Sequence, residues 1–276
     1  MKKACVIGYP ITHSRSPLIH NHWLKQYGID GLYEKREVKP EDLAAFFQTL
    51  TAEGYAGCNV TIPHKEAAIP LMGKTDDIVR RTGSLNTVYL DSGIIAATSS
   101  DGEGFYQNLM TTVPDLKWNG GTAVVLGAGG SARAIIERLL RTGLSRIVIV
   151  NRTQARAQEL ADLFGPRVKV GRFGDESDDT TLLVNTTSQG MKGQSPLELD
   201  LSALPDTCVV ADIVYVPLKT ELLKLAEARG LKTVGGLGML LHQAVVGFEK
   251  WFGVRPEVTQ ELYDLVAKDV DPEYGR

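Results

Sequence analysis

Short apolar runs alternate with helical patterns along this chain, and that alternation limits the possible folds more than any other feature. Apolar runs at residues 4–8, 33–38 and 57–60 predict strands, and helical patterns at residues 17–27 and 40–53 separate them. Strands joined by helices usually pair in parallel, because the helix carries the chain back to the end where the previous strand began. The sequence therefore predicts an α/β fold with mostly parallel sheets.

A second series of strands follows the first and indicates a second domain. Strands are predicted at residues 122–126, 146–150, 182–185 and 209–212, with helices at residues 131–141 and 153–164. The other predicted elements are a short helix at residues 64–71, a hairpin of residues 87–90 and 94–97, and helices at residues 237–251 and 257–270. A chain of 276 residues is long enough for two domains of ordinary size.

Composition argues against several classes of partner. The net charge of −3 and a pI near 6.0 give no attraction to nucleic acid or to an anionic membrane. No apolar run approaches the length of about 18 residues that a membrane span needs. Cys5, Cys58 and Cys208 each lie in an apolar run and lack zinc-site spacing, which predicts buried free thiols in a cytoplasmic protein. The five histidines show no metal-ligand spacing either, so no metal site is predicted.

Glycines after the first strand of the second series predict a dinucleotide site. Gly127-Ala128-Gly129-Gly130-Ser131 follows the strand at residues 122–126 and opens a helix. Glycines permit a tight turn and let the backbone approach a pyrophosphate, which the helix N-terminus attracts. A plain structural turn would use the same glycines, so the cluster alone does not decide between the two.

The residues after the next strand indicate which dinucleotide to expect. NAD sites usually carry an acidic residue there, roughly 20 residues beyond the glycines, for the ribose 2′-hydroxyl. Here Asn151, Arg152, Thr153 and Arg156 come first, and no acid precedes Glu159. Guanidinium groups bind phosphate through parallel hydrogen bonds, so NADP(H) is favoured. Two surface arginines at the start of a helix are the alternative.

Polar residues at the ends of the early strands are suited to a small acid that carries hydroxyl groups. Ser14 and Ser16 can bond a carboxylate beside the helix that follows, although Ser16 before a proline is also an ordinary helix cap. Asn59 and Thr61 share one face of their strand because successive side chains alternate. Asn86 precedes a later strand, and its amide can both donate to and accept from a hydroxyl.

Lys65 and Asp101 are the candidate acid–base pair. A lone lysine is usually a solvated surface residue, so chemistry at Lys65 requires a carboxylate partner. Asp101 stands where the last strand of the first series ends, a position from which it could also cap the next helix. In the helix at residues 237–251, Met239 and Gln243 lie four residues apart and therefore on one face. Core packing is the alternative for Met239.

These segments together resemble the shikimate dehydrogenase family, from residue 5 to about residue 250. The resemblance is carried by Gly8-Tyr-Pro-Ile-Thr-His-Ser-Arg-Ser-Pro17, Gly57-Cys-Asn-Val-Thr-Ile-Pro-His-Lys65, Gly83-Ser-Leu-Asn-Thr87, Asp101-Gly-Glu-Gly104, Gly127-Ala-Gly-Gly130, Asn185-Thr-Thr-Ser-Gln-Gly-Met191 and Gly238-Met-Leu-Leu-His-Gln243. The Asn-Arg-Thr run that begins at Asn151 fits the same family.

The resemblance implies reversible NADPH-dependent reduction of 3-dehydroshikimate to shikimate, a step of chorismate and aromatic amino acid biosynthesis. It implies that Lys65 donates the proton and that Asp101 holds both the lysine and the substrate. The implied substrate contacts are Ser14, Ser16, Asn59, Thr61, Asn86, Tyr215 and Gln243. The implied contacts to NADP(H) are Gly127, Ala128, Gly129, Gly130, Ser131, Asn151, Arg152, Thr153, Arg156, Thr186, Ile213, Gly236 and Met239.

The resemblance also implies that the C-terminal helices return to the first domain. We therefore expect a substrate domain of residues 1–103 and 237–276, and a Rossmann-type NADP-binding domain of residues 104–236. The expected partner is a small-molecule substrate, with no nucleic acid and no membrane. Monomer and homodimer both stay open.

One departure from the family lies beside the candidate acid–base pair. The family usually reads Asn-Thr-Asp where this chain has Ser99-Ser100-Asp101, so the loop that carries Asp101 could be braced differently. A quinate/shikimate or aminoshikimate-type dehydrogenase is the alternative within the family. A non-catalytic NADP-binding sensor is the alternative of another class, and the presence of both Lys65 and Asp101 argues against it.

Overall fold

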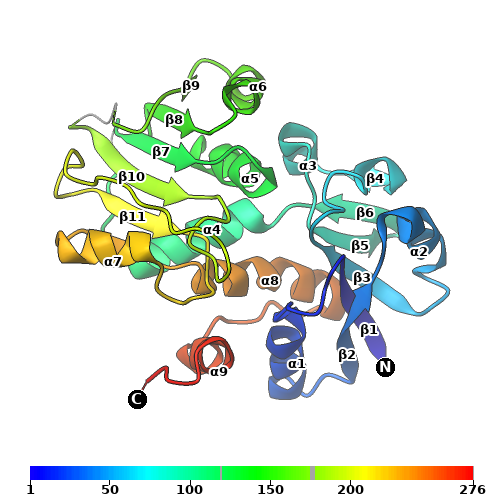
Figure 1. Ribbon diagram of the computed structural model, residues 1–276. Coiled ribbons are helices and arrows are strands. Elements are labelled where there is room, and N and C mark those ends of the chain that lie inside the picture. Colours follow the sequence, from blue (N-terminus) through cyan, green and yellow to red (C-terminus); the bar gives the residue numbers. More distant parts are fainter. Residues whose placement is uncertain (119, 175–177, 276) are drawn as a thin grey trace. The chain divides into compact units, whose positions relative to one another are not determined.

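The computed structural model describes residues 1–118, 120–174 and 178–275. Figure 1 shows two groups of strands, each with its own helices, which confirms the predicted α/β class. Within those described ranges, no helix is both long and apolar enough to cross a membrane.

The chain divides into two compact units. The first contains Met1–Asp101 and Leu241–Val266, and the second contains Gly102–Leu240 and Ala267–Arg276. The first unit is therefore built from two separate parts of the sequence. Its C-terminal part ends earlier than the expected boundary at residue 276, because the end of the chain groups with the second unit.

The first unit contains a mixed six-stranded sheet in the order β2-β1-β3-β5-β6-β4. Its strands are β1 (Lys2–Gly8), β2 (Gly31–Glu37), β3 (Tyr55–Val60), β4 (Lys74–Thr75), β5 (Thr87–Asp91) and β6 (Ile94–Thr98). Strands β1, β2 and β3 are parallel, whereas β5 runs antiparallel to both β3 and β6. The predicted hairpin is thus confirmed. Its turn places Ser92 and Gly93 at φ 53° and 83°, as a two-residue hairpin of this kind requires.

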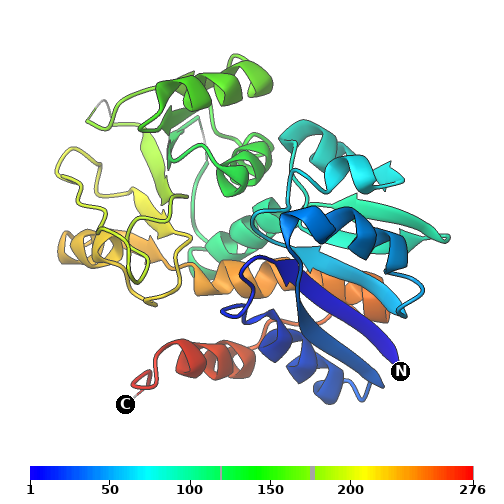
Figure 2. The ribbon, with the colours of Figure 1, turned by 45° about the vertical axis from the view of Figure 1, so that its right-hand side comes forward.

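Helices cover both faces of this sheet (Figure 2). They are α1 (Ser16–Gln26), α2 (Leu43–Thr49), α3 (Asp77–Thr82) and, from residue 241 on, α8 (Leu237–Phe252). Phe46 and Phe47 of α2 belong to one apolar cluster with Val60 of β3. On the opposite face, Trp23 of α1 and Phe248 of α8 pack edge to face, 5.3 Å between ring centroids. Strand alternation therefore sends Val60 to one core and leaves Asn59 on the other face.

The second unit contains a parallel six-stranded sheet in the order β12-β11-β10-β7-β8-β9. Its strands are β7 (Thr122–Leu126), β8 (Arg146–Val150), β9 (Val168–Val170), β10 (Thr180–Asn185), β11 (Val209–Asp212) and β12 (Lys232–Val234). Numbered from β7, this is the order 3-2-1-4-5-6 of doubly wound dinucleotide-binding folds. The order reverses between β7 and β10, and ligands of such sheets bind at the carboxyl ends of the strands at that point.

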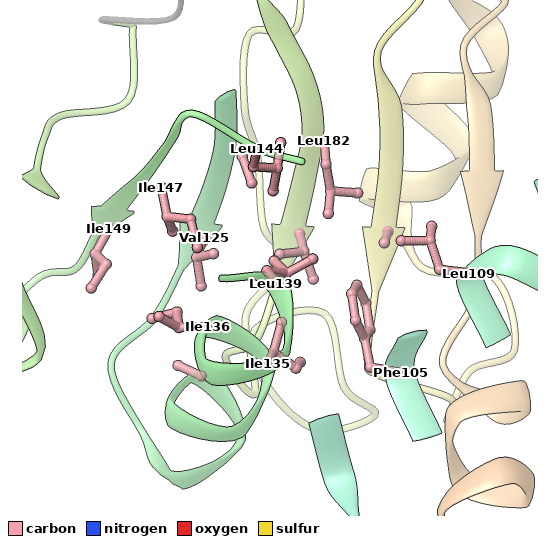
Figure 3. Close-up of a cluster of buried hydrophobic side chains, with 14 of the residues drawn as sticks. Phe105, Leu109, Val125, Ile135, Ile136, Leu139, Leu144, Ile147, Ile149 and Leu182 are labelled. Carbon is pink, nitrogen blue, oxygen red and sulfur yellow. The ribbon is translucent and has the colours of Figure 1, made fainter. Parts of the chain in front are cut away.

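Two apolar clusters, one on each face of this sheet, join it to its helices. The helices of the unit are α4 (Asp101–Thr112), α5 (Gly130–Leu139), α6 (Gln154–Phe164) and α7 (Glu221–Ala228), and α9 (Gln260–Val270) follows α8. Figure 3 shows Ile135 and Leu139 of α5 beside Val125 of β7, with Phe105 of α4 in the same cluster. Because both faces of these strands are covered, their sequences are largely continuous apolar runs. Such runs allowed the strands to be predicted from the sequence.

The predicted helix at residues 64–71 is wrong. That segment forms turns and ends in a single 3-10 turn, Ile69–Leu71. Pro70 lacks the backbone N–H that a helix would need there, so the turns do not extend into an α-helix. The predicted helix at residues 40–53 is likewise shorter, with a 3-10 turn at Pro40–Asp42 before α2.

Two helices of the structure were not predicted, and both have a clear start signal. Asp76 caps α3 by accepting a hydrogen bond from the Val79 N–H at 3.0 Å. Thr220 caps α7 by accepting from the Leu223 N–H at 3.5 Å. Side-chain oxygens at this position bond the N–H groups that the first helical turn leaves unpaired.

Candidate active site

Lys65 and Asp101 meet in the first unit, as the sequence required of an acid–base pair. The Lys65 Nζ lies 2.5 Å from Asp101 Oδ2, and the two side chains are 19% and 9% exposed. Lys65 is presented by the turn after β3, and Asp101 is the first residue of α4. A charge-assisted hydrogen bond in a largely buried setting fixes the direction of the ammonium group.

Asn86 ties this pair to the other predicted substrate residues. Its Nδ2 donates to Asp101 Oδ1 at 2.7 Å and lies 3.3 Å from Gln243 Oε1. Its Oδ1 accepts from the Ser100 N–H at 2.8 Å and from the Thr87 hydroxyl at 2.9 Å. The side chain is almost fully buried, so its amide is held in one orientation by several partners at once.

The departure at Ser99-Ser100 proves to involve two serines with very different surroundings. The Ser100 hydroxyl donates to the Gln243 carbonyl oxygen at 2.8 Å and accepts from Asn86 Nδ2 at 3.0 Å. The Ser99 hydroxyl, also buried, has no hydrogen-bond partner among the described residues. The loop of Asp101 is therefore braced by Ser100 and Asn86, and Ser99 takes no part in the bracing.

We expect Ser100→Ala to lower the free energy of unfolding by about 1–3 kcal/mol, because Gln243 and Asn86 lose a buried partner. Ser99→Ala is the matched control, since it removes an equally buried hydroxyl that has no partner to lose. We expect its effect to stay within about 0.5 kcal/mol of zero or to be stabilising. Urea unfolding of both variants measures the difference. Equal losses in the two variants would contradict the assigned bracing role of Ser100.

Tyr33 joins the site from β2 and was missed by sequence reasoning. Its hydroxyl donates to Asn59 Oδ1 at 2.6 Å, and Asn59 Nδ2 in turn donates to the Asn86 carbonyl oxygen at 3.1 Å. Burial raises the pKa of the Tyr33 phenol well above its ordinary value, which a hydrogen bond with Ser16 partly offsets. Tyr33 thus links Asn59 to Ser16. No local pattern connects residue 33 with residue 59, so the sequence carried no signal for this contact.

Ser14 and Ser16 lie where β1 passes into α1. The Ser16 N–H donates to the Ser14 hydroxyl at 3.3 Å, and Ser16 is already the first residue of the helix. The N-cap position is Arg15, which makes no side-chain capping bond. The alternative that Ser16 serves as an ordinary helix cap is therefore wrong. Thr61 follows β3, and its backbone N–H bonds the Ile7 carbonyl oxygen at 2.9 Å.

In the second unit, the glycine cluster stands at the carboxyl end of β7. Gly127 has a φ of 108°, and a Cβ atom there would come within 2.7 Å of the Thr186 hydroxyl oxygen. Gly129 is the N-cap of α5 and has no side chain to occupy the N–H groups of the first turn. The Thr186 hydroxyl donates to the Leu126 carbonyl oxygen at 2.6 Å, which fixes the segment after β10 beside the cluster.

The predicted 2′-phosphate residues follow the neighbouring strand β8. Asn151 Nδ2 donates to the Thr153 carbonyl oxygen at 2.8 Å, and Thr153 is the N-cap of α6. Arg152 and Arg156 are both exposed on either side of that cap. The two guanidinium groups therefore lie at the N-terminus of α6, after the strand that neighbours β7. Positive side chains and a helix N-terminus both favour the binding of an anion.

Four further predicted residues lie after β11 or after β12 in the second unit. The Ile213 N–H donates to the Asn185 carbonyl oxygen at 3.1 Å, and Tyr215 follows in the same segment. A Cβ atom on Gly236 would approach the Ile213 carbonyl oxygen to 2.2 Å, so a side chain does not fit there. Met239 is buried in the core of the second unit, which agrees with the core-packing alternative. Tyr215 is the one predicted substrate residue of the second unit.

The described residues contain no group of three or more His, Cys, Asp or Glu side chains that could hold a metal ion. Cys5, Cys58 and Cys208 are buried free thiols, as expected.

Comparison with known proteins agrees with this arrangement. Three family models match: "Shikimate dehydrogenase substrate binding domain" over residues 6–88, "Shikimate / quinate 5-dehydrogenase" over residues 109–177, and "Shikimate 5'-dehydrogenase C-terminal domain" over residues 236–260.

Individual relatives cover nearly the whole chain. The chain is 54% identical over 271 residues to a shikimate dehydrogenase (NADP(+)) of Rhodopseudomonas palustris strain HaA2, with 97% of this chain and 96% of the relative covered. It is 50% identical over 273 residues to the enzyme of the same name from Azorhizobium caulinodans, with 98% and 97% covered.

A solved structure extends the likeness to the fold. Shikimate 5-dehydrogenase from Thermus thermophilus, in complex with NADP(H) and shikimate, superposes with a TM-score of 0.88. It is 32% identical, and the match covers 98% of this chain and 100% of that chain. On its motifs, its two sheets and these relatives, the chain belongs to the shikimate dehydrogenase family.

Proposed function

We propose that this chain is an NADP-dependent shikimate dehydrogenase, which reduces 3-dehydroshikimate to shikimate and catalyses the reverse oxidation. The observation that carries the proposal is the 2.5 Å contact between Lys65 Nζ and Asp101 Oδ2, held by the Asn86 amide. A lysine with a fixed carboxylate partner can give a proton to a ketone oxygen and take it back from the alcohol. The names of the close relatives and the bound ligands of the Thermus enzyme support the same reaction.

The second unit has residues that fit NADP(H). The tight Gly127 turn and the uncapped start of α5 suit a pyrophosphate, and Arg152 and Arg156 suit a 2′-phosphate. When bound, NADPH supplies the hydride for the ring ketone. Thr186, Ile213, Gly236 and Met239 are the further residues that we assign to this cofactor.

The protein's own part in the reaction is to place the substrate and to move one proton. Ser14 and Ser16 bind the substrate carboxylate, while Asn59, Thr61, Asn86, Tyr215 and Gln243 bind its ring hydroxyls. In the reducing direction Lys65 donates a proton to the carbonyl oxygen as it becomes an alcohol. Asp101 holds the lysine through their 2.5 Å contact, so the proton is presented at a fixed position.

Two further properties follow from the same proposal. The buried reduced thiols suit a cytoplasmic enzyme, because disulfides are rare in that compartment. A homodimer stays a prediction alongside the monomer.

Nicotinamide absorbance tests the function directly. Purified protein is assayed with shikimate and with quinate, each against NADP⁺ and NAD⁺. We expect rapid NADP⁺ reduction with shikimate and much slower reaction of the other three pairs, because Arg152 and Arg156 replace the acidic residue of NAD sites. Comparable turnover of quinate would move the chain to the quinate/shikimate relatives, and a preference for NAD⁺ would remove the role of the arginines. No turnover with any pair would reject the proposal.

A further inference from the structure

Asp212 is a buried carboxylate at the carboxyl end of β11, and the reaction assigned above does not use it. The side chain is 2% exposed. Its Oδ1 accepts from Asn185 Nδ2 at 2.9 Å and from the Val214 N–H at 3.0 Å, and its Oδ2 accepts from the Thr220 hydroxyl at 2.7 Å. Asn185 is the last residue of β10, whereas Val214 and Thr220 lie at the two ends of the loop after β11, so one carboxylate joins two segments of the chain.

The Asn185 contact fixes the loop after β10. Asn185 stands directly opposite Asp212 in the register of the two strands. Its Nδ2 also donates to the Gln189 carbonyl oxygen at 3.1 Å, and its Oδ1 accepts from the Thr187 N–H at 3.0 Å. The Asn185 amide, held by Asp212, therefore fixes the turn of residues 187–189.

The Val214 and Thr220 contacts fix the loop after β11. The Val214 N–H bond turns the backbone immediately beyond the strand, and Thr220 is the cap of α7 at the far end of that loop. The two loops are also joined to each other, because the Lys192 N–H donates to the Val216 carbonyl oxygen at 2.8 Å. Together they carry Thr186, Ile213 and Tyr215.

An ionised carboxylate is costly at such a position, because burial removes it from water. Burial raises the pKa of Asp212 from 3.8 to about 6, and the hydrogen bonds from Val214, Thr220 and Asn185 offset part of that rise. All three of these donors are uncharged. A buried polar group with this many partners specifies one arrangement of the chain more than it adds stability.

We propose that Asp212 is a positioning residue that holds the loops after β10 and β11 in the shape that binds NADP(H). The proposal rests on the cofactor site proposed above. Asp212 acts through Asn185 and Thr220, since all of its hydrogen bonds run to these loops and its side chain is buried. Loss of the carboxylate frees the loops after β10 and β11, which lie at the carboxyl ends of the strands, where dinucleotides bind.

The test compares NADPH affinity, measured by fluorescence titration, with steady-state kinetics in NADP⁺ and in shikimate. We expect Asp212→Ala to weaken NADPH binding about tenfold, or about 1.4 kcal/mol. The KM for NADP⁺ should rise by a similar factor, while kcat at saturating NADP⁺ changes little. Asp212→Asn should restore affinity to within about threefold of wild type, because its Oδ1 can still accept from Asn185 and Val214 and the Thr220 hydroxyl can rotate.

Thr122→Val provides the matched control. Thr122 is a buried threonine at the amino end of β7, and its hydroxyl donates to Asp179 Oδ2 at 2.9 Å. The control therefore removes the same type of threonine–aspartate bond from the opposite edge of the same sheet. We expect it to leave NADPH affinity unchanged. Thr220→Val removes the bond at Asp212 itself and should weaken NADPH binding in the same direction as Asp212→Ala, which keeps the test decisive if Asp212→Ala fails to fold.

Wild-type affinity separates the two proposals. Wild-type protein that does not bind NADPH would overturn the cofactor site and this inference together. Wild-type protein that binds NADPH, with Asp212→Ala or Thr220→Val binding equally well, would overturn the inference alone. Equal weakening by Thr122→Val would also overturn it, because the effect would then be general destabilisation of the sheet.

Discussion

Replacing Lys65 by alanine should lower kcat by about 10²–10⁴-fold and leave NADPH affinity unchanged. The variant loses the group that protonates the ketone oxygen, whereas the residues assigned to NADP(H) lie in the second unit. The fold should survive, because Asp101 keeps its hydrogen bond from Asn86 at 2.7 Å and becomes more accessible to water. Steady-state kinetics in both directions, with NADPH titration in parallel, measure the two quantities.

Lys74→Ala is the matched control for this experiment. Lys74 Nζ also lies 2.5 Å from a carboxylate oxygen, that of Asp91, but its side chain is 61% exposed. Exposed pairs contribute little, so this variant should retain wild-type kcat. Unchanged kcat in Lys65→Ala would end the assignment of the proton donor, and equal losses in both variants would show a general effect of removing a lysine that pairs with a carboxylate.

Acid should destabilise the first unit through His20. The ring is fully buried and stacks on Tyr33 with 4.0 Å between centroids, beside Trp23 and Trp251. Burial lowers the pKa of His20 from 6.5 to about 3, and the Asn59 side chain opposes this only in part. The native state therefore binds fewer protons than the unfolded chain below pH 6.5. The free energy of unfolding should fall by about 2 kcal/mol near pH 5 and by about 4 kcal/mol near pH 3 from this group alone.

The measurement compares the pH slope of wild type with that of His20→Leu. Asp212 affects the pH slope with the opposite sign: because burial raises its pKa to about 6, it adds to the free energy of unfolding as the pH falls towards 3.8. Wild type and His20→Leu both contain Asp212, so its contribution cancels when their slopes are subtracted. Trp118→Phe in both proteins leaves Trp23 and Trp251, both in the first unit, as the fluorescent reporters of urea unfolding. His22→Leu, on the same helix, shows the effect of the histidine-to-leucine change at a second position of α1. A wild-type slope in His20→Leu would refute the assignment.

Strands were predicted most accurately from the sequence where both faces of the sheet are covered. The second sheet is covered on both faces, so β7, β8 and β11 are plain apolar runs whose predicted bounds match the structure. Short edge strands such as β4 and β12 have no such run and were missed. The same holds for α3, whose six residues are too few to show helical periodicity.

Site residues could be predicted from the sequence where they belong to a recognisable local motif. Lys65 and Asp101 were paired from their chemistry and their places at strand ends. Tyr33, Ser100 and Asp212 acquire their roles through partners 26, 143 and 27 residues away, respectively, and no local pattern records such contacts. The helix expected at residues 64–71 was wrong because Pro70 lacks the backbone N–H that an α-helix would need there.

The division of the first unit between residues 1–101 and 241–266 sets an order of assembly during synthesis. Domains generally fold as they emerge from the ribosome, amino-terminal parts first. Here all six strands of the second sheet, from Thr122 to Val234, have been made before Phe248 and Trp251 exist to pack against Trp23 and His20. The half of the protein that is translated first is therefore the half that completes its core last, and until then its aromatic face is without the segment that covers it.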